Sequence, residues 1–280
     1  MISKKTGDCL IDKSIQTKNT LGEIMIKHRN NFYITLTLKR GFSLKKFKLK
    51  STLFTSSPVF NLFYPCICIG CGSDVIDNGN FLCLQCIHDL PKTHFHLHAN
   101  NPLEKIFWGR IPVTSAMSEV YFSKESIIQN MIHEFKYRGN KNAGRYFGNL
   151  IGKSLLNCNR FNVDIVIPLP LFEKKEKMRG YNQAEILCDG ISEIINKPVI
   201  KKNVIRKIFT DSQTKKHRTE RWKNVENTFH VTDPQQLEGK HILLVDDVVT
   251  TGATLEACGS EILKVKNTLV SIATFAMATR

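Results

Sequence analysis

The sequence predicts an α/β fold: a mostly parallel sheet with helices on both faces, preceded by a small zinc-ribbon-like module. From about residue 101 onward, helix-like and strand-like segments alternate, which is typical of parallel strands joined by crossover helices. Between residues 61 and 100, paired cysteines take the place of the apolar periodicity that a core needs. We therefore expect an extension (1–60), a four-cysteine module (61–100) and an α/β domain (101–280).

The first 60 residues combine a basic excess with little regular pattern. They hold 12 Lys and Arg against 3 Asp and Glu, whereas residues 61–280 hold 28 against 22. A tail of this composition usually stays solvated or touches polyanions loosely. We interpret residues 1–60 as a disordered extension that the working protein does not need.

Four cysteines in two C-x-x-C pairs predict a structural Zn²⁺ site. Cys68 and Cys71 are separated from Cys83 and Cys86 by 11 residues, and four thiolates can close a tetrahedron around zinc. A closed site leaves no open coordination position, so the expected role is structural. Cys66 could replace Cys68 in a shifted register. Paired cysteines of this kind also indicate a reducing compartment, so we expect a cytoplasmic protein.

Local patterns predict the elements of the α/β domain in order. Apolar residues at helical spacing predict helices at residues 127–135, 146–156, 183–195 and 255–264. β-rich or continuous apolar runs predict strands at residues 163–167, 241–245 and 269–276. No apolar run is long enough to span a membrane, and the N-terminus does not resemble a signal peptide.

Two sequence patterns allow two structural interpretations each. Residues 148–154 (GNLIGKS) resemble a phosphate-binding Walker A loop, but they have three residues between the glycines where four are required. They also lie inside a helical pattern, so we predict a helix. His94, His96 and His98 alternate, which predicts one half-exposed face of a strand, with a second metal site as the alternative.

The stretch HILLVDDVVTTGATLEAC, from residue 241 to residue 258, carries the most chemistry. A buried strand ends in Asp246 and Asp247, and a loop of small residues then opens a helix. Backbone N–H groups, threonine hydroxyls and the positive end of the helix together make a phosphate cradle. Carboxylates accept hydrogen bonds only, so a vicinal diol such as that of ribose suits them beside a phosphate. The cradle consists of Thr250, Thr251, Gly252, Ala253 and Thr254.

These residues resemble those of a known family. The strand, acid pair and T-T-G-A-T loop resemble the PRPP-binding motif of type I phosphoribosyltransferases. IPLPLFEKKEKMRGYNQAEIL at residues 167–187 resembles the ComF family, as do MIHEFKYRG at residues 131–139 and the paired C-x-x-C motifs. A further spaced set also resembles it: Arg206, Thr210, Gln213, Arg221, Asn224 and Phe229. The resemblance covers roughly residues 61–280 and leaves residues 1–60 unexplained.

The resemblance implies a phosphoribosyltransferase-like fold for the α/β domain, a ligand, and a role for each of several residues. The ligand is PRPP or another phosphorylated ribose, accompanied by Mg²⁺. Asp246 and Asp247 would hold the ribose diol, and residues 250–254 the 5′-phosphate. Residues 206–224 would form a mobile basic lid. The pyrophosphate side would be formed by Pro168, Leu169, Pro170 and Arg179, and the catalytic residues would be Asp246, Asp247 and Arg179.

Two functions stay open from the sequence. One is a phosphoribosyltransferase, a glycosyltransferase linked to DNA uptake in natural transformation. The other is a non-catalytic accessory protein that keeps the loop as a ligand sensor and binds single-stranded DNA, alongside DNA-uptake proteins. The net charge of +15 and the basic segment 201–223 favour DNA binding, as do Tyr137, Tyr181 and Trp222 beside cationic residues. The intact motif favours ligand binding and identifies no acceptor.

Overall fold

The computed structural model describes residues 67–278 except residues 75, 77–79, 125, 138 and 207–227. The chain divides into two units, one of Met1–Cys68 with Gly72–Leu84, the other of Ile69–Cys71 with Gln85–Arg280. The predicted extension and most of the predicted lid, including Thr210, Gln213, Arg221 and Asn224, lie outside the described residues. The domain boundaries at residues 60 and 100 stay predictions.

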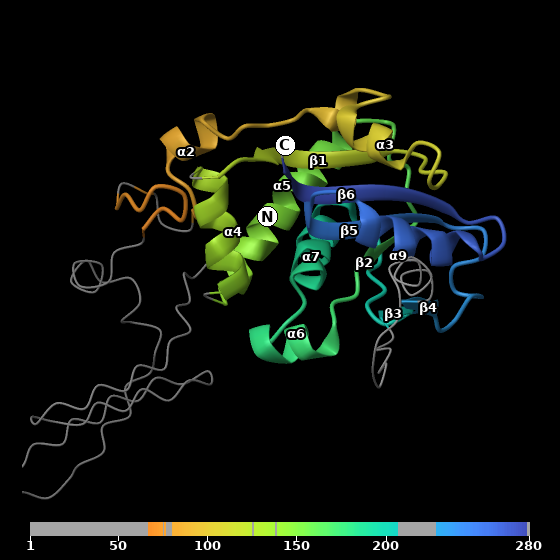
Figure 1. The fold of residues 1–280 in the computed structure, drawn as a ribbon. Helices are drawn as coiled ribbons and strands as arrows, with labels where there is room; N and C mark the ends of the chain where they lie inside the picture. Colours follow the sequence, from red (N-terminus) through yellow and green to blue (C-terminus); the bar gives the residue numbers. More distant parts are fainter. Residues whose placement is uncertain are drawn as a thin grey trace, which may run out of the picture. The chain divides into compact units, whose positions relative to one another are not determined.

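Four parallel strands form the sheet of the second unit, in the order β1-β6-β5-β2 (Figure 1). Both central strands are buried along most of their length, as their continuous apolar runs predict. The strands are β1 (Ala116–Phe122), β2 (Ile165–Pro168), β5 (His241–Val249) and β6 (Leu269–Ala278). A separate antiparallel pair joins β3 (Val204–Arg206) to β4 (Phe229–Val231).

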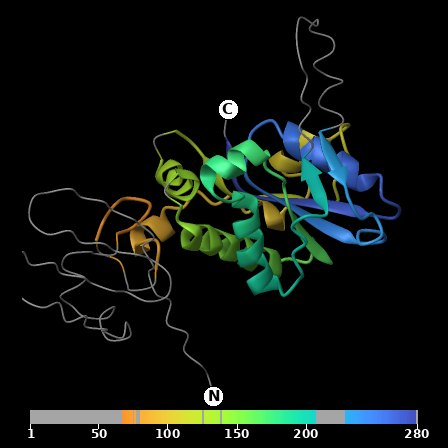
Figure 2. The same ribbon diagram turned by 90° about the horizontal axis from the view of Figure 1, so that it is seen from below.

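Helices cover both faces of the sheet, which confirms the predicted fold class (Figure 2). α5 (Lys141–Leu156) and α7 (Gln183–Ile195) pack together on one face, and α3 (Pro102–Phe107) and α9 (Ala253–Leu263) lie on the other. The other helices of the described ranges are α2 (Leu84–His88), the 3₁₀ helix η2 (Phe95–Leu97), α4 (Ile127–Tyr137) and α6 (Glu173–Arg179).

The Walker-like glycines lie inside α5, so the helix prediction for this segment is confirmed. They allow α5 to approach α7 closely. A Cβ atom at Gly148 would lie 2.3 Å from the carbonyl oxygen of Leu187, and one at Gly152 would lie 2.7 Å from the Cβ of Ile194. The glycine spacing in this motif therefore serves helix packing.

Two strand predictions differ most from the structure, while β2 and β6 differ from their predicted bounds by one or two residues. β5 does not end at Val245 but continues to Val249, because Asp246 and Val248 stay in register with Thr274 and Ala276 of β6. The predicted strand at His94–His98 is wrong. Phe95–Leu97 forms a 3₁₀ turn, and His94 before it has a left-handed φ of 56°.

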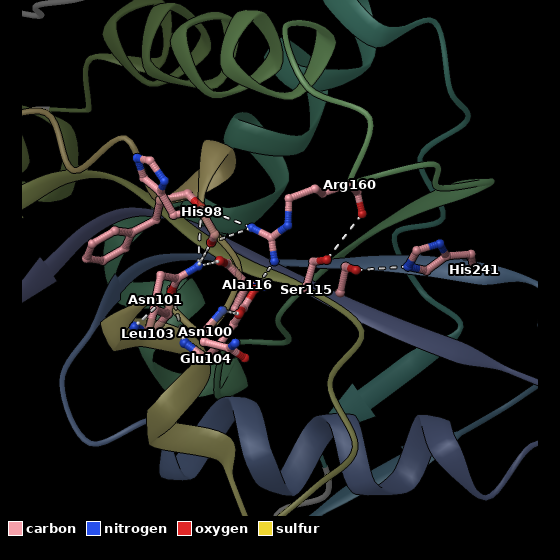
Figure 3. Close-up of polar contacts among 11 residues, drawn as sticks. His98, Asn100, Asn101, Leu103, Glu104, Ser115, Ala116, Arg160 and His241 are labelled. Carbon is pink, nitrogen blue, oxygen red and sulfur yellow. Dashed lines mark hydrogen bonds and ion pairs between the residues drawn. The ribbon is translucent and has the colours of Figure 1, made fainter.

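A buried polar network fixes the segment that leads into the sheet (Figure 3). The Asn101 carboxamide accepts from two amides of the first turn of α3, and its Nδ2 donates to three carbonyls, those of Phe95, His98 and Ala116. The Arg160 guanidinium donates to the Glu104 carboxylate and to the His98 carbonyl. These contacts hold α3 against the start of β1, and α3 in turn borders the loop that follows β5.

Candidate functional site

The acid pair lies near the carboxyl end of β5, a central strand of the sheet. Oδ1 of Asp246 accepts the backbone N–H of Asp247 at 2.8 Å. Oδ2 of Asp247 lies 2.8 Å from Nζ of Lys136, and these two side chains are 13% and 18% exposed. Among the described residues, no hydrogen bond reaches the second oxygen of either carboxylate. The pair therefore offers two acceptors to a ligand.

The pKa of Asp246 is raised above its ordinary value. Its carboxyl is partly exposed, but it is surrounded by enough protein that burial is the main cause, and the charge of Asp247 adds to it. The cationic groups of Lys136 and Arg206 oppose the rise. A ligand that donates hydrogen bonds to the ionised pair therefore competes with proton uptake at this position.

The loop after β5 is held in place from α3. Gly252 has a φ of 74° and precedes the first turn of α9, and a Cβ atom there would lie 2.9 Å from Cγ2 of Ile106. Nη1 of Arg110 donates to the carbonyl oxygen of Thr251 at 2.9 Å, and Nη2 pairs with the carboxylate of Glu256. Ala253 and Thr254 of the predicted cradle lie in the first turn of α9, so the connecting loop is Thr250–Gly252.

A cavity of about 520 Å³ opens beside this loop, and Thr250, Thr251, Lys105 and Arg110 are among its lining residues. The helix end supplies a partial positive charge and Lys105 adds to it, whereas the charge of Arg110 is balanced by Glu256. The surroundings of the loop thus favour an anion. Another cavity, of about 380 Å³ beside Trp108 and Arg160, shares no residue with the motif.

The Pro168–Pro170 segment follows β2, the neighbour of β5. The amide of Leu169 donates to the carbonyl of Val245 at 2.8 Å, and Nδ2 of Asn182 donates to the carbonyl of Leu169 at 3.0 Å. The carbonyl oxygen of the Asn182 side chain also accepts from Ala184, so Asn182 caps α7 as well. This segment and the acid pair lie on adjacent strands at the same edge of the sheet.

Arg179 ends α6 and turns toward the start of α7. Its Nη1 donates to Oε1 of Gln183 at 2.7 Å, and its guanidinium lies 6.0 Å from the ring centre of Tyr137. Within the described part of the chain, its Nε and the Nε2 of Gln183 are buried without a hydrogen-bond partner. Such groups cost free energy unless a ligand or water satisfies them. Burial raises the pKa of Tyr181. The charge of Arg179 opposes this rise, and the charge of Asp247 adds to it.

The guanidinium of Arg206 lies against the rings of Phe172 and Phe229. Its guanidinium carbon is 3.5 Å from the ring centre of Phe172 and 5.1 Å from that of Phe229. Burial lowers the pKa of Arg206, and the carboxylate of Asp246 opposes that change. The sequence predicted Arg206 in the lid, but the structure places it on β3, where its charge opposes the raised pKa of Asp246.

Lys136 is the residue that sequence reasoning missed. It lay inside the quoted segment MIHEFKYRG, but nothing in that segment indicated which residue would reach the acid pair. The three predicted groups, at residues 168–170, 246–247 and 250–254, lie at the carboxyl edge of the sheet on β2 and β5. The roles assigned to them and to Arg179 stay predictions.

The four predicted cysteine ligands form one cluster. The Sγ atoms of Cys68, Cys71, Cys83 and Cys86 all lie within 4.8 Å of one another. Zinc–sulfur bonds of about 2.3 Å in a tetrahedron place the sulfurs about 3.8 Å apart, so the cluster fits a metal ion with little adjustment. The Cys83 amide also points to Sγ of Cys68 at 3.3 Å, as amides do toward thiolates. Cys66, the alternative ligand, lies outside the described residues.

Among the described residues, this cluster is the one group of three or more cysteine, histidine or acidic side chains close enough to hold a metal. The histidines at positions 94, 96 and 98 form no such group, which removes support for a second metal site there. None of the helices in the described ranges has the length and apolar character that a membrane crossing requires.

Comparison with known proteins identifies relatives of the chain. Residues 184–279 match the phosphoribosyl transferase domain family. DNA utilization protein YhgH of Shigella flexneri is 28% identical over 188 residues, which are 65% of this chain and 78% of that protein. Competence protein ComFC of Bacillus subtilis is 26% identical, over 56% of this chain and 61% of that protein. Competence protein F of Haemophilus influenzae is 25% identical, over 69% and 89%.

Solved structures give weaker likenesses. A glutamine phosphoribosylpyrophosphate amidotransferase from Bacillus subtilis is 17% identical with a TM-score of 0.37, and the match covers 51% of this chain and 30% of that one. A purine phosphoribosyltransferase from Pyrococcus horikoshii is 20% identical with a TM-score of 0.32, over 48% and 73%.

Proposed function

We propose that this chain, a ComF-type protein with a phosphoribosyl transferase domain, binds PRPP or another phosphorylated ribose at the carboxyl edge of β5. The observation that carries the proposal is the pairing of two acceptor oxygens on Asp246 and Asp247 with an anion-favouring loop on the same strand end. A ligand that satisfies both needs hydroxyl donors next to a phosphate. A ribose phosphate is a small molecule that has both.

The rest of the edge suits the pyrophosphate of PRPP. The backbone of Leu169 is fixed by two hydrogen bonds, and Arg179 has a buried Nε without a partner among the described residues. A guanidinium can donate two parallel hydrogen bonds to phosphate oxygens. Mg²⁺ arriving on the pyrophosphate oxygens would neutralise part of their charge.

The experiment that tests this proposal measures the thermal stabilisation of the protein by PRPP and Mg²⁺ and the affinity for PRPP by calorimetry. A ligand at 100 times its Kd should add about 2.7 kcal/mol to the free energy of unfolding. The Asp246→Asn, Asp247→Asn double variant should lose this, because amides present N–H donors where the diol needs acceptors. No stabilisation of the wild type, or equal stabilisation of both proteins, would contradict the proposal.

Ribose 5-phosphate and 2-deoxyribose 5-phosphate provide a second, sharper comparison. The deoxy sugar lacks one hydroxyl, so one carboxylate oxygen stays without its donor at a cost of about 1–3 kcal/mol. We expect the deoxy sugar to bind at least about fivefold more weakly. Inorganic phosphate serves as the control for the loop alone. Equal affinity for the two sugars would remove the acid pair from the ligand site.

In the catalytic form of the proposal, the protein is a phosphoribosyltransferase. The bond from ribose C1 to a pyrophosphate oxygen breaks and its electron pair leaves on pyrophosphate. An acceptor lone pair forms the new bond to C1, and the acceptor then loses a proton. Arg179 would stabilise the leaving group, while Asp246 and Asp247 hold the ring. PRPP-dependent pyrophosphate release across a panel of nucleobases and amines tests turnover separately from binding.

The second candidate function is single-stranded DNA binding, with or without turnover. The names of the relatives, DNA utilization and competence proteins, favour a link to DNA uptake. Of the three aromatic side chains predicted to stack on bases, Tyr181 is buried, Tyr137 is 65% exposed beside Arg179, and Trp222 lies outside the described residues. The described part of the chain therefore leaves Tyr137 as the stacking candidate.

Fluorescence anisotropy with a labelled oligonucleotide tests this candidate. Binding through several phosphates should weaken with salt at a log–log slope of roughly −0.7 per contact. Tyr137→Ala should reduce affinity, whereas an exposed aliphatic control, Leu156→Ala, should not. Competition by PRPP would place DNA at the same site. No binding at low salt would end the DNA proposal and leave the PRPP proposal untouched.

Zinc is proposed as the structural metal of the cysteine cluster. The spacing of the four sulfurs supports a tetrahedral ion, and zinc is the ion most often held by four cysteines in two C-x-x-C pairs. Bound there, it would add folding free energy to a module with little apolar core.

A further inference from the structure

The last turn of α4 contacts the candidate site through three consecutive residues. The carbonyl of Phe135 accepts a hydrogen bond from the Tyr181 hydroxyl, Nζ of Lys136 lies 2.8 Å from Oδ2 of Asp247, and the ring of Tyr137 faces the guanidinium of Arg179. The residues on either side of Lys136 therefore hold it in position. Its ammonium group therefore reaches Asp247 from a helix end that is anchored on both sides of Lys136.

The Lys136–Asp247 pair is also buried, unlike the other lysine pairs of the described chain. Its side chains are 18% and 13% exposed, whereas the lysines that pair with Glu173, Asp189 and Glu261 are 39% exposed or more. Buried ion pairs cost desolvation energy, so one at a ligand site needs a reason other than stability. The adjacent carboxyl of Asp246 supplies that reason, because two neighbouring carboxylates repel each other.

The charged and titratable groups around the acid pair come from four elements. Lys136 comes from α4, Arg206 from β3 and Cys258 from α9, and Arg179 and Tyr181 flank the turn before α7. Burial raises the pKa of the Cys258 thiol and raises that of Tyr181 to about 12, so both stay neutral near pH 7. Among the described residues, Lys136 is the one cation within ion-pair distance of either carboxylate.

We propose that Lys136 is a positioning residue of the ribose site: its ammonium group pairs with Oδ2 of Asp247, which leaves Oδ1 to accept a ligand hydroxyl. The identity of the ligand in this inference rests on the proposed function, whereas the effect of Lys136 on the acid pair does not. The charge of Lys136 opposes the raised pKa of Asp246, so without Lys136 the acid pair would take up a proton at higher pH. A protonated oxygen is a donor that faces a ligand donor. Lys136 thus acts on the ligand through Asp247.

The test compares Lys136→Met and Lys136→Arg with the wild type, and uses Lys264→Met as the control because Lys264 pairs with Glu261 at an exposed position. The first readout is the titration of ¹³C-labelled aspartate carboxyls by NMR, which needs no ligand. Loss of a cation within 4–6 Å should raise the midpoint of the acid pair by about 1–3 pH units in the Met variant. The Arg variant and the control should keep the wild-type midpoint.

The second readout is PRPP affinity as a function of pH. The ionised pair is the binding form, so affinity should rise with pH through the midpoint, and the Met variant should follow the same curve displaced to higher pH. At pH 7 the Met variant should bind at least about tenfold more weakly, which corresponds to one pH unit of displacement. The deficit should shrink as the pH rises. A purely structural role would lower affinity equally at every pH.

The outcomes separate this inference from the proposed function. If the wild type binds no PRPP, the proposed function fails and the carboxyl titration still decides the role of Lys136. Equal midpoints in the wild type and the Met variant overturn the inference, as does an Arg variant that titrates like Met. If the Met variant does not fold, Lys136→Gln is titrated in its place and must show the same upward displacement.

Discussion

Replacing Gly252 by alanine tests whether α3 sets the position of the phosphate loop. Gly252 has a φ of 74°, in the left-handed region, where an alanine costs about 1–2 kcal/mol. Its Cβ atom would also lie 2.9 Å from Cγ2 of Ile106 and 3.0 Å from Cε1 of Phe107. Overpacking of this kind adds about 1–3 kcal/mol. We therefore expect the free energy of unfolding to fall by about 2–5 kcal/mol.

Gly239 provides the matched control for this substitution. It has a φ of 69°, and a Cβ atom there would have nothing within 4 Å, so Gly239→Ala carries the backbone strain without the contact. Urea unfolding should give a loss of about 1–2 kcal/mol for the control and a clearly larger one for Gly252→Ala. PRPP affinity should fall only in Gly252→Ala, because the loop must move away from α3. Equal losses in the two variants would refute the argument that α3 packs on the loop.

The remaining predictions concern the metal cluster, a buried carboxyl, the polar network and the chain start. Cys83→Ser should reduce zinc from one ion per chain to none by metal analysis, and unchanged zinc would remove Cys83 from the ligand set. Glu119 is buried and its pKa is raised mainly by that burial, so wild-type stability should fall as pH rises above about 4.5, and Glu119→Gln should flatten this dependence in thermal melts. Glu104→Gln should lower stability by about 1–3 kcal/mol in urea, since it leaves the guanidinium of Arg160 without its carboxylate; an unchanged midpoint would show that the pair adds nothing. A chain that starts at Ser56 should fold and retain zinc, and an insoluble product would show that the extension belongs to the fold.

Much of the fold follows from local pattern. α7 has the predicted bounds. α4 begins at the predicted residue and ends two residues later, and α9 begins two residues earlier and ends one residue earlier than predicted. These segments have a clear apolar period and, for α7, a capping asparagine. β1 gave no such signal, because Ser118 and Glu119 interrupt its apolar residues even though both are buried. Ser118 and Glu119 are accommodated by partners on other segments: the Ser118 carbonyl accepts from Thr93, and the Glu119 carboxylate from Ser154.

The motif residues of the site could be found from the sequence because they are consecutive. Asp246, Asp247 and the loop after them lie within one strand–loop–helix connection, so the sequence alone shows that they are neighbours in the fold. Lys136 and Arg110 reach the same connection from positions more than 100 residues earlier. Their contacts depend on how α4 and the turn after α3 pack in three dimensions, and a one-dimensional pattern does not contain that information.

The arrangement of charge at this edge explains why carboxylates can lie beside a phosphate loop at all. Alone, Asp246 and Asp247 would repel each other and any phosphate nearby. Lys136 pairs with one carboxylate and the charge of Arg206 acts on the other, so the two anions are screened from the loop while each keeps an oxygen without a partner among the described residues. The loop has a cation of its own in Lys105. In the proposed function, the loop would take the phosphate of a sugar phosphate and the two carboxylate oxygens would take its hydroxyls, whereas phosphate or ribose alone would satisfy only one of these two places.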